Sequence, residues 1–246
     1  MCGRYTLIAN AEAIRRLFEL PDFDERLVVP RYNIAPTQPI VVVRLHEGRG
    51  GRELVPMRWG LIPGWVKDPK AMPSLINARA EGIAEKPSFC NAFRRRRCLV
   101  PASGFYEWQA RGKGPKQPFS IRPDSTSPDG QVLLAFAGLW ETWFGADGSE
   151  IDTAAILTVA CNECVRRLHE RMPAIIDPAD FEAWLSPDLD PNDATSLLRP
   201  APEELLTCAP VSTRVNAVAN DDAALWDAIV ESHPAPAPDT GQPSLF

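Results

Sequence analysis

A series of short apolar runs, each bounded by turn-forming residues, is the feature that most limits the folds open to this chain. The runs are rich in Val, Ile, Leu, Phe and Trp, which is typical of strands. Helical segments are fewer and shorter, and they do not alternate regularly with the strands. The pattern therefore predicts an α+β domain of curved, largely antiparallel sheets rather than a doubly wound parallel sheet. Strands are expected at residues 2–7, 40–45, 53–59, 98–101, 105–109, 119–122, 132–143, 151–159, 174–176 and 205–209, and helices at 11–20 (capped by Asn10), 79–85, 163–168, 177–184, 193–198 and 222–230.

Length and composition are those of a single globular domain. The 246 residues are 45% hydrophobic and 24% charged, which is enough for one large core. We find no apolar run long enough to span a bilayer and no signal-peptide pattern at the N-terminus, so we expect a cytoplasmic protein without a membrane partner. Its six cysteines are too dispersed for a secreted disulfide framework and are expected to be reduced.

Charge is divided unevenly along the chain. Residues 1–120 contain 20 Lys and Arg against 11 Asp and Glu, a net +9, whereas residues 121–246 contain 6 against 21, a net −15. Any phosphate-binding face must therefore be built from the first half. The four-arginine run at residues 94–97 lies in that half, although a solvated surface is the more common explanation of such a run.

The second residue carries the most specific chemistry. Removal of Met1 would leave Cys2 with a free amine beside its thiol, a 1,2-aminothiol. Against an amide the sulfur acts through an acyl intermediate, whereas against an aldehyde the amine forms a Schiff base and the sulfur closes a thiazolidine ring. Position alone leaves open a third interpretation, in which Cys2 is a small buried residue near the start of a strand.

Six local motifs occur in a fixed order and together are highly specific. The motifs are Cys2-Gly3-Arg4-Tyr5, Tyr32-Asn33-Ile34-Ala35-Pro36-Thr37, Met57-Arg58-Trp59-Gly60-Leu61-Ile62-Pro63-Gly64-Trp65, Asn77-Ala78-Arg79-Ala80-Glu81, Cys98-Leu99-Val100-Pro101 followed by Gly104-Phe105-Tyr106-Glu107-Trp108, and His169-Glu170-Arg171-Met172-Pro173. With these motifs, the chain from Cys2 to about residue 230 resembles the SRAP family of abasic-site-processing proteins associated with the bacterial SOS response.

The resemblance implies a single SRAP-type domain over residues 1–232, with a barrel-like core and short flanking helices. It implies a monomeric, nucleoid-associated protein that senses abasic sites in single-stranded DNA and captures them as a thiazolidine through Cys2. It also implies self-removal of Met1, which is a peptidase activity, and weak lyase activity through β-elimination from the Schiff base. No cofactor is implied.

The resemblance also assigns roles to individual catalytic residues. Cys2 captures the sugar aldehyde, and Glu107, whose pKa should be raised among aromatic neighbours, protonates the ring oxygen as the sugar opens. His169 moves a proton or steadies the Schiff base and a nearby phosphate. Asn77 orients the aminothiol and the opened sugar, a role compatible with capping a following helix.

DNA contacts are assigned in the same way. The resemblance assigns phosphate or sugar contacts to Arg4, Asn33, Thr37, Arg79 and Arg171. Trp59, Pro63 and Trp65 would form an apolar wedge that favours single strands or strand junctions over intact duplex.

Two other classes of function compete with this interpretation. An N-terminal-nucleophile amidohydrolase of the glutamine amidotransferase type would also need Cys2, but it has no use for an aromatic-embedded Glu107. A noncovalent DNA-binding protein would not need Cys2 at all. Cys161 and Cys164 near His169 resemble half of a zinc site, but no second pair stands at suitable spacing, so no metal is expected.

The C-terminal residues 233–246 form a Pro-rich tail that we expect to be disordered. It ends in a sequence similar to the short peptides with which bacterial repair proteins bind the DNA sliding clamp, with Gln242, Leu245 and Phe246 as the contacts. A chance match of five residues is an equally good explanation. If the peptide binds the clamp, deleting the last five residues should abolish binding, and unchanged clamp binding would exclude this role.

Overall fold

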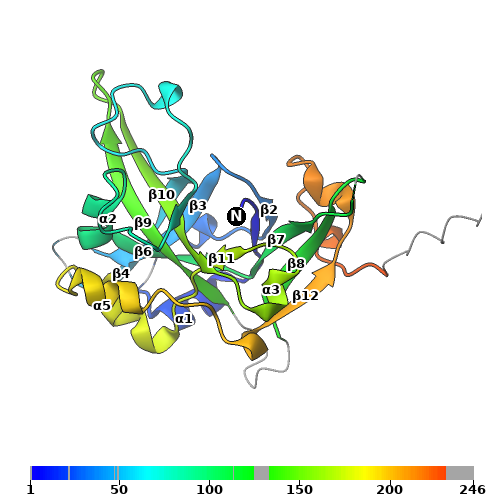
Figure 1. Ribbon diagram of the computed structural model, residues 1–246. Coiled ribbons are helices and arrows are strands. Elements are labelled where there is room, and N and C mark those ends of the chain that lie inside the picture. Colours follow the sequence, from blue (N-terminus) through cyan, green and yellow to red (C-terminus); the bar gives the residue numbers. More distant parts are fainter. Residues whose placement is uncertain are drawn as a thin grey trace, which may run out of the picture.

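One long strand, β10 (Glu150–Ala160), joins the two parts of the fold on which the site depends. The computed structural model describes residues 2–230, apart from positions 22, 47, 49, 113 and 125–132. The predicted tail, with Gln242, Leu245 and Phe246, lies outside the described residues. In the described ranges the strands form two sheets with short helices around them (Figure 1), which confirms the mixed α+β prediction.

The larger sheet closes on itself. Around it the strands are β3 (Pro39–Leu45), β4 (Arg52–Trp59), β10, β9 (Leu134–Phe144) and β6 (Arg97–Ala102). Each strand pairs with the next in this order and β6 pairs back with β3, which gives a five-stranded barrel. All neighbours are antiparallel except β4 and β10, which run parallel.

Beyond the barrel, β10 continues and acquires two further partners. On one edge it pairs in parallel with β5 (Asn77–Arg79), and on the other it pairs antiparallel with β11 (Arg171–Pro173). Thr158 faces Arg79 on one side and Pro173 on the other. The same strand therefore holds two of the sequence motifs on opposite edges.

The second sheet is antiparallel throughout and contains five strands. Its order is β12 (Leu206–Pro210), β8 (Gln117–Pro123), β7 (Gly104–Gln109), β1 (Tyr5–Leu7) and β2 (Arg31–Ile34). Tyr5 links this sheet to the barrel, because its ring packs edge-on against Trp59 at 5.3 Å and against Phe136 at 6.1 Å between centroids. All three rings are buried, so the first strand is fixed at the junction of the two sheets.

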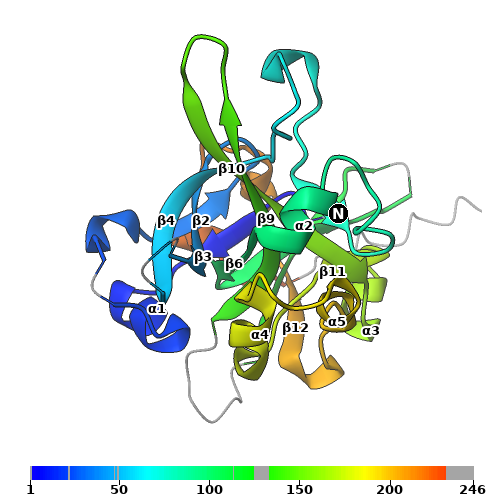
Figure 2. The ribbon, with the colours of Figure 1, turned by 90° about the vertical axis from the view of Figure 1, so that its left-hand side faces the viewer.

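The helices are short and lie around the sheets. Figure 2 shows α1 and α5 at the end of the molecule opposite the tip of the β9–β10 hairpin. As predicted, Asn10 caps the first helix, accepting a hydrogen bond from the Ala13 amide at 2.8 Å. No helix in the described part of the chain is long and apolar enough to cross a membrane. The helices are α1 (Ala11–Phe18), α2 (Cys90–Arg95), α3 (Glu163–Arg166), α4 (Phe181–Leu185) and α5 (Pro191–Ser196), with 3-10 turns η1 (Glu25–Leu27), η2 (Pro69–Ala71), η3 (Pro178–Asp180), η4 (Glu203–Leu205), η5 (Thr213–Asn216) and η6 (Ala223–Leu225).

Several predicted elements were wrong. The helix expected at 79–85 is replaced by the end of β5 and a turn, because pairing with β10 outweighs local helix propensity. The strand expected at 174–176 lies just earlier, as β11, and the helix expected at 222–230 is reduced to the single turn η6. Strands β2 and β5 and helix α2 had no sequence prediction; each is six residues or shorter.

The four-arginine run is divided between surface and core. Arg94 and Arg95 are exposed, whereas Arg97 is 2% exposed and donates hydrogen bonds to the carbonyls of Phe93 and Trp184 at 2.5 and 2.7 Å. Arg96 forms an ion pair with Glu141 at 2.9 Å. Only part of this run is therefore available for a nonspecific electrostatic contribution to DNA binding.

Candidate active site

Pairing of β1 with β7 brings the N-terminal residues beside the aromatic strand that carries Glu107. Tyr5 is in register with Phe105, and the Tyr106 amide donates to the Arg4 carbonyl at 3.0 Å. Continuing this antiparallel alignment places Gly3 opposite Glu107 and Cys2 opposite Trp108, next to Glu107. Strand β1 begins near the middle of the molecule (Figure 1), so the residues before it lie where the two sheets meet.

Cys2 is fully buried. Burial, and next the negative charge of Glu107, raise the pKa of the Cys2 thiol well above its ordinary value. The sulfur lies 3.9 Å from the Arg4 carbonyl, within reach of a weak thiol hydrogen bond. The thiol is therefore neutral at physiological pH and is not stored as a reactive thiolate.

Asn77 contacts Cys2 directly. Its side-chain amide nitrogen donates to the Cys2 carbonyl at 2.7 Å, which fixes the backbone of the second residue. Its carbonyl oxygen Oδ1 is buried and has no hydrogen-bond partner among the described residues. A buried acceptor costs about 1–3 kcal/mol when it is left unpaired. The Asn77 Oδ1 atom is thus a polar group positioned for a ligand donor beside Cys2.

Glu107 on β7 is 4% exposed. Burial raises the pKa of its carboxyl group, and the positive charge of His169 opposes that rise. Because the carboxyl also raises the pKa of Cys2, Glu107 lies within electrostatic range of both Cys2 and His169. A carboxyl group with a raised pKa can remain protonated near neutral pH and act as an acid.

His169 lies between α3 and β11, two residues before β11 begins. Its ring nitrogen Nδ1 accepts a hydrogen bond from the Arg171 backbone amide at 2.9 Å. In the neutral imidazole the proton is therefore on Nε2. The four residues predicted to be catalytic, Cys2, Asn77, Glu107 and His169, are thus gathered from β5, β7 and the chain next to β1 and β11.

The arginine of the last motif is engaged within the protein. The Arg171 guanidinium forms a bidentate ion pair with Glu81, at 2.6 and 2.9 Å, and also donates to the Thr158 carbonyl. Arg171 is 9% exposed, whereas the Glu81 side chain is 62% exposed. The ion pair holds the pKa of Glu81 below its usual range. A direct contact between Arg171 and phosphate, which the sequence predicted, would require this carboxylate to move.

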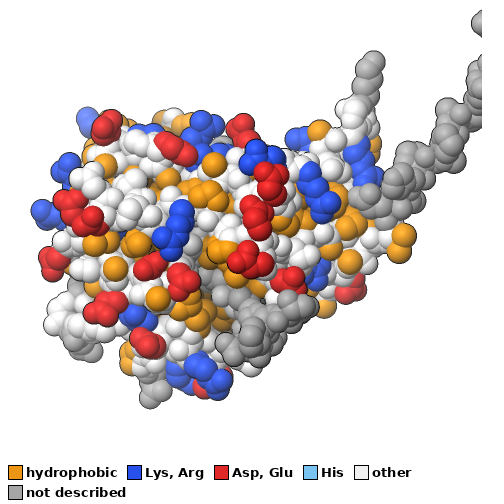
Figure 3. Space-filling model, turned by 60° about the horizontal axis from the view of Figure 1, so that its bottom comes forward, with side chains coloured by type: hydrophobic (Ala, Val, Ile, Leu, Met, Phe, Trp, Pro, Cys, Tyr) orange, Lys and Arg blue, Asp and Glu red, His pale blue; other side chains and the backbone are white. Residues whose placement is uncertain are grey.

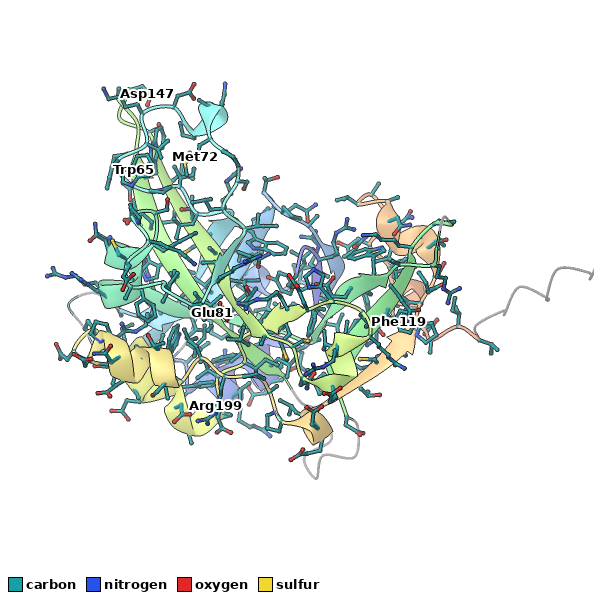
Figure 4. The ribbon with its side chains drawn as sticks, in the orientation of Figure 1. Trp65, Met72, Glu81, Phe119, Asp147 and Arg199 are labelled. Carbon is teal, nitrogen blue, oxygen red and sulfur yellow. The ribbon has the colours of Figure 1, made fainter. Side chains whose placement is uncertain are left out.

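Glu81 is a site residue that sequence reasoning quoted in a motif without assigning it a role. Figure 4 shows Glu81 near the middle of the molecule, between the barrel and the second sheet. It lies four residues after Asn77 in the same motif, which was the only available signal. Its partner is 90 residues away in the sequence, so no local pattern could have revealed the pair.

Arg4 and Asn33 form an internal clamp rather than an open DNA-binding surface. The Arg4 guanidinium donates to Asn33 Oδ1 and to the Val215 carbonyl, both at 2.7 Å. The Asn33 amide donates to the carbonyls of Val215, Ala217 and Asn220 at 2.7–3.2 Å. Asn33 is fully buried, so its predicted contact with DNA is replaced by a role in holding residues 215–220 against β2.

Thr37 and Arg79 are exposed, as a DNA contact requires. The Thr37 amide donates to the Trp59 carbonyl at 2.8 Å, and its φ of 70° is in the left-handed region. Such a conformation costs a threonine free energy and is common at functional sites. Arg79 lies on β5, two residues beyond Asn77.

Of the three residues predicted to form an apolar wedge, only Trp65 is exposed. Trp65 is 62% exposed and lies beside the β9–β10 hairpin. Figure 4 labels Trp65, Met72 and Asp147 in this projecting part of the molecule. Trp59 is 0% exposed and its indole nitrogen donates to the Ile76 carbonyl at 2.9 Å, so it belongs to the core. Pro63 is buried as well. Sequence could not separate core tryptophans from exposed ones within this motif.

In the folded protein, ion pairs between the basic and acidic halves of the sequence partly neutralise the difference in charge between them. Arg31 from the basic half forms an ion pair with Asp221, and Arg96 pairs with Glu141 from the acidic half. On the face in Figure 3, acidic and basic side chains are interspersed. In the described ranges, no group of three or more His, Cys, Asp or Glu side chains could hold a metal ion.

Fold and site together define a class: an α+β barrel protein with a buried second-residue cysteine beside a carboxyl group, an amide and an imidazole. The family model described as SOS response associated peptidase (SRAP) matches residues 1–218. The chain therefore belongs to the SRAP family.

Relatives extend over nearly the whole chain. The abasic site processing protein YoqW of Bacillus subtilis (strain 168) is 38% identical over 235 residues, which cover 95% of this chain and 100% of that protein. The abasic site processing protein HMCES of Gallus gallus is 35% identical over 257 residues, covering 90% of this chain and 76% of that protein.

Solved structures share the fold. A crystal structure of a protein from Bacteroides thetaiotaomicron superposes with a TM-score of 0.79 at 25% identity, covering 93% of this chain and 100% of that one. A second, from Bordetella bronchiseptica, has a TM-score of 0.71 at 26% identity and covers 86% and 100%.

Proposed function

We propose that this protein processes abasic sites in single-stranded DNA by forming a covalent thiazolidine link through Cys2 after Met1 is removed. The observation that carries the proposal is the burial of Cys2 beside Glu107, a carboxyl group with a raised pKa, with Asn77 bonded to the Cys2 backbone at 2.7 Å. The relatives named as abasic site processing proteins support the same substrate. The link would shield the lesion from strand scission during the response to DNA damage.

The raised pKa of Cys2 favours a particular order of steps. Because the resting thiol is neutral, the freed amine attacks the C1′ aldehyde of the opened sugar first. Loss of water gives the Schiff base, and the sulfur then adds to the same carbon and releases its proton. One aldehyde and one aminothiol thus give one thiazolidine and one water.

Each neighbouring residue has a role in this sequence. Protonated Glu107 supplies the proton that opens the sugar ring, and its carboxylate can receive the proton released later by the thiol. Asn77 Oδ1 accepts a hydrogen bond from the amine or from a sugar hydroxyl. His169, with its proton on Nε2, donates to a phosphate or sugar oxygen.

DNA binding in this proposal relies on the exposed residues of the site. Arg79 contacts a phosphate next to the lesion, and Trp65 stacks on a base or blocks the opposing strand, which favours single strands. Arg4 and Arg171 contribute positive electrostatic potential to the site while they remain bound to partners within the protein. The protein would act as a monomer without a cofactor, with Met1 removal as its peptidase activity and weak β-elimination as its lyase activity.

A glutamine amidotransferase-type hydrolase needs the same cysteine, but the buried carboxyl group argues against it. In an N-terminal-nucleophile hydrolase the free amine is the base that activates the thiol. Burial of Cys2, and next the proximity of Glu107, raise the pKa of the thiol and so make the thiolate harder to form. Direct measurement of glutamine hydrolysis by the mature protein separates the two functions.

The proposal is tested with an oligonucleotide that lacks one base. The purified protein is incubated with single-stranded DNA containing one abasic site, and with the same DNA after borohydride has reduced the sugar aldehyde to an alcohol. We expect a heat-stable shifted band only with the unreduced site, and an adduct mass equal to protein without Met1 plus DNA minus one water. A heat-stable band with the reduced site, or no band with either DNA, would contradict the proposal.

A further inference from the structure

Two cysteines that the proposed function does not use, Cys164 and Cys208, lie close together. Cys164 is in α3, and Cys208 is in β12, the edge strand of the second sheet. The Cys208 sulfur lies 3.1 Å from the Cys164 carbonyl oxygen, although 44 residues separate them. Both side chains are partly exposed, so a small reactant can reach the pair.

The two thiols differ in their ionisation. A hydrogen bond between the Cys208 and Cys164 side chains lowers the pKa of Cys164, and the nearby Arg167 charge lowers it further against the effect of burial. The same hydrogen bond, together with burial, raises the pKa of Cys208. Cys164 is thus the nucleophile of the pair, and Cys208 retains its proton.

Arg167 is held in place beside the pair. Its guanidinium donates to the Cys208 carbonyl at 3.4 Å and lies 5.6 Å from the centroid of the Phe119 ring. Figure 4 labels Phe119 on the second sheet, and Figure 1 shows α3 next to β8 and β12 in the same region. An arginine next to a partly exposed thiolate is the usual environment of a peroxide-reactive cysteine.

We propose that Cys164 and Cys208 form a hydroperoxide-reactive dithiol that closes to a disulfide. The Cys164 thiolate attacks the peroxide, the O–O bond breaks, and the alcohol or water leaves, with Cys164 as a sulfenic acid. The Cys208 sulfur then attacks Cys164, the S–O bond breaks, and water leaves with the Cys208 proton. Two thiols are oxidised, and one hydroperoxide is reduced.

Two of the other cysteines, Cys2 and Cys98, are poorer targets, whereas Cys90 and Cys161 are partly exposed like the pair and serve as controls in the test below. Cys2 and Cys98 are fully buried, and burial raises the pKa of both thiols. Cys90 lies in α2 beside the barrel. The dithiol therefore consumes peroxide while the Cys2 thiol stays reduced, a prediction that does not depend on the chemistry proposed for Cys2.

Closing the disulfide also restrains the segment that carries His169. The backbone amides of Leu168 and His169 both donate to the Val165 carbonyl, at 2.8 and 3.0 Å, and the Cys161 amide donates to the Glu170 carbonyl. A covalent link from Cys164 to β12 joins this hydrogen-bonded turn to the second sheet. Amide exchange in residues 165–169 should therefore slow on oxidation.

The test uses the full-length protein and hydrogen peroxide at one equivalent, followed by thiol alkylation and peptide mapping. We expect a Cys164–Cys208 disulfide, loss of two alkylatable thiols, and an unmodified Cys2. Cys161→Ser and Cys90→Ser should leave the disulfide intact. Cys208→Ser should stop at a sulfenic acid on Cys164 that a dimedone probe traps, and Cys164→Ser should lose both products.

Three results would overturn the inference. They are a disulfide between Cys161 and Cys164, no thiol loss in the wild type, or oxidation of Cys2 in preference to the pair. The sulfenic acid in Cys208→Ser serves as a second readout, because it reports the nucleophile even where the disulfide cannot form.

Discussion

Replacing Cys2 with alanine is expected to reduce the heat-stable cross-link to abasic DNA to background. Alanine at this position still offers a free amine once Met1 is removed, so the Schiff base forms but no sulfur closes the ring. Borohydride reduction during the reaction should therefore trap a covalent product from the Cys2→Ala protein. The measurement is a denaturing gel with and without borohydride.

Serine gives the intermediate case. Cys2→Ser keeps the amine and offers a hydroxyl, which is a poorer ring-closing atom, so its adduct should be lost on heating and recovered by reduction. Cys90→Ser, a substitution of the same kind in α2, is the matched control and should cross-link like the wild type. Full heat-stable cross-linking by Cys2→Ala would show that the sulfur is not involved.

Replacing Glu107 with glutamine is expected to slow cross-linking by about 10²–10⁴-fold, the usual contribution of a general acid. Glutamine preserves the shape and hydrogen bonding of the side chain but cannot release a proton. Glu150→Gln, at the exposed first residue of β10, is the matched control and should leave the rate unchanged. The effect is measured as the single-turnover rate of cross-linking, with protein in excess over DNA.

The pH dependence provides a second readout for Glu107. An acid must be protonated to act, so the rate should fall as pH rises through the pKa of Glu107, and burial moves that fall to higher pH than an exposed glutamate would give. The Cys2 amine must be unprotonated, which gives a rising limb on the acid side. The wild type should show a bell-shaped profile, whereas Glu107→Gln should keep only the rising limb. A descending limb that survives in Glu107→Gln would assign the acid to another group.

The fold class followed from sequence because long strands carry strong local patterns. Strands β3, β4, β7 and β10 are within one or two residues of their predicted positions. Short elements such as β5 could not be predicted from the sequence, since a three-residue strand is stabilised by its partners rather than by its own residues. Barrel closure through the parallel β4–β10 pair is likewise a long-range event with no local signal.

The candidate site likewise combines features that the sequence predicted with features that it could not predict. The family resemblance predicted Cys2, Asn77, Glu107 and His169 as site residues, and the structure brings them close together. Residue type alone did not distinguish arginines and asparagines that face solvent from those used inside the protein. Asn33 donates to three backbone carbonyls and Arg171 forms an ion pair with a glutamate, and these partners lie far away in sequence.

The shared strand β10 has a consequence for how this architecture tolerates change. Its two edges pair with four strands. A register shift of one residue would therefore disrupt all four pairings and move every side chain of β10 to the opposite face of the sheet. Added or deleted residues can be absorbed only at the hairpin tip between Phe144 and Glu150, before those ladders begin. Variation in length among related proteins should therefore accumulate in that projecting tip, while the catalytic end of the strand keeps its spacing.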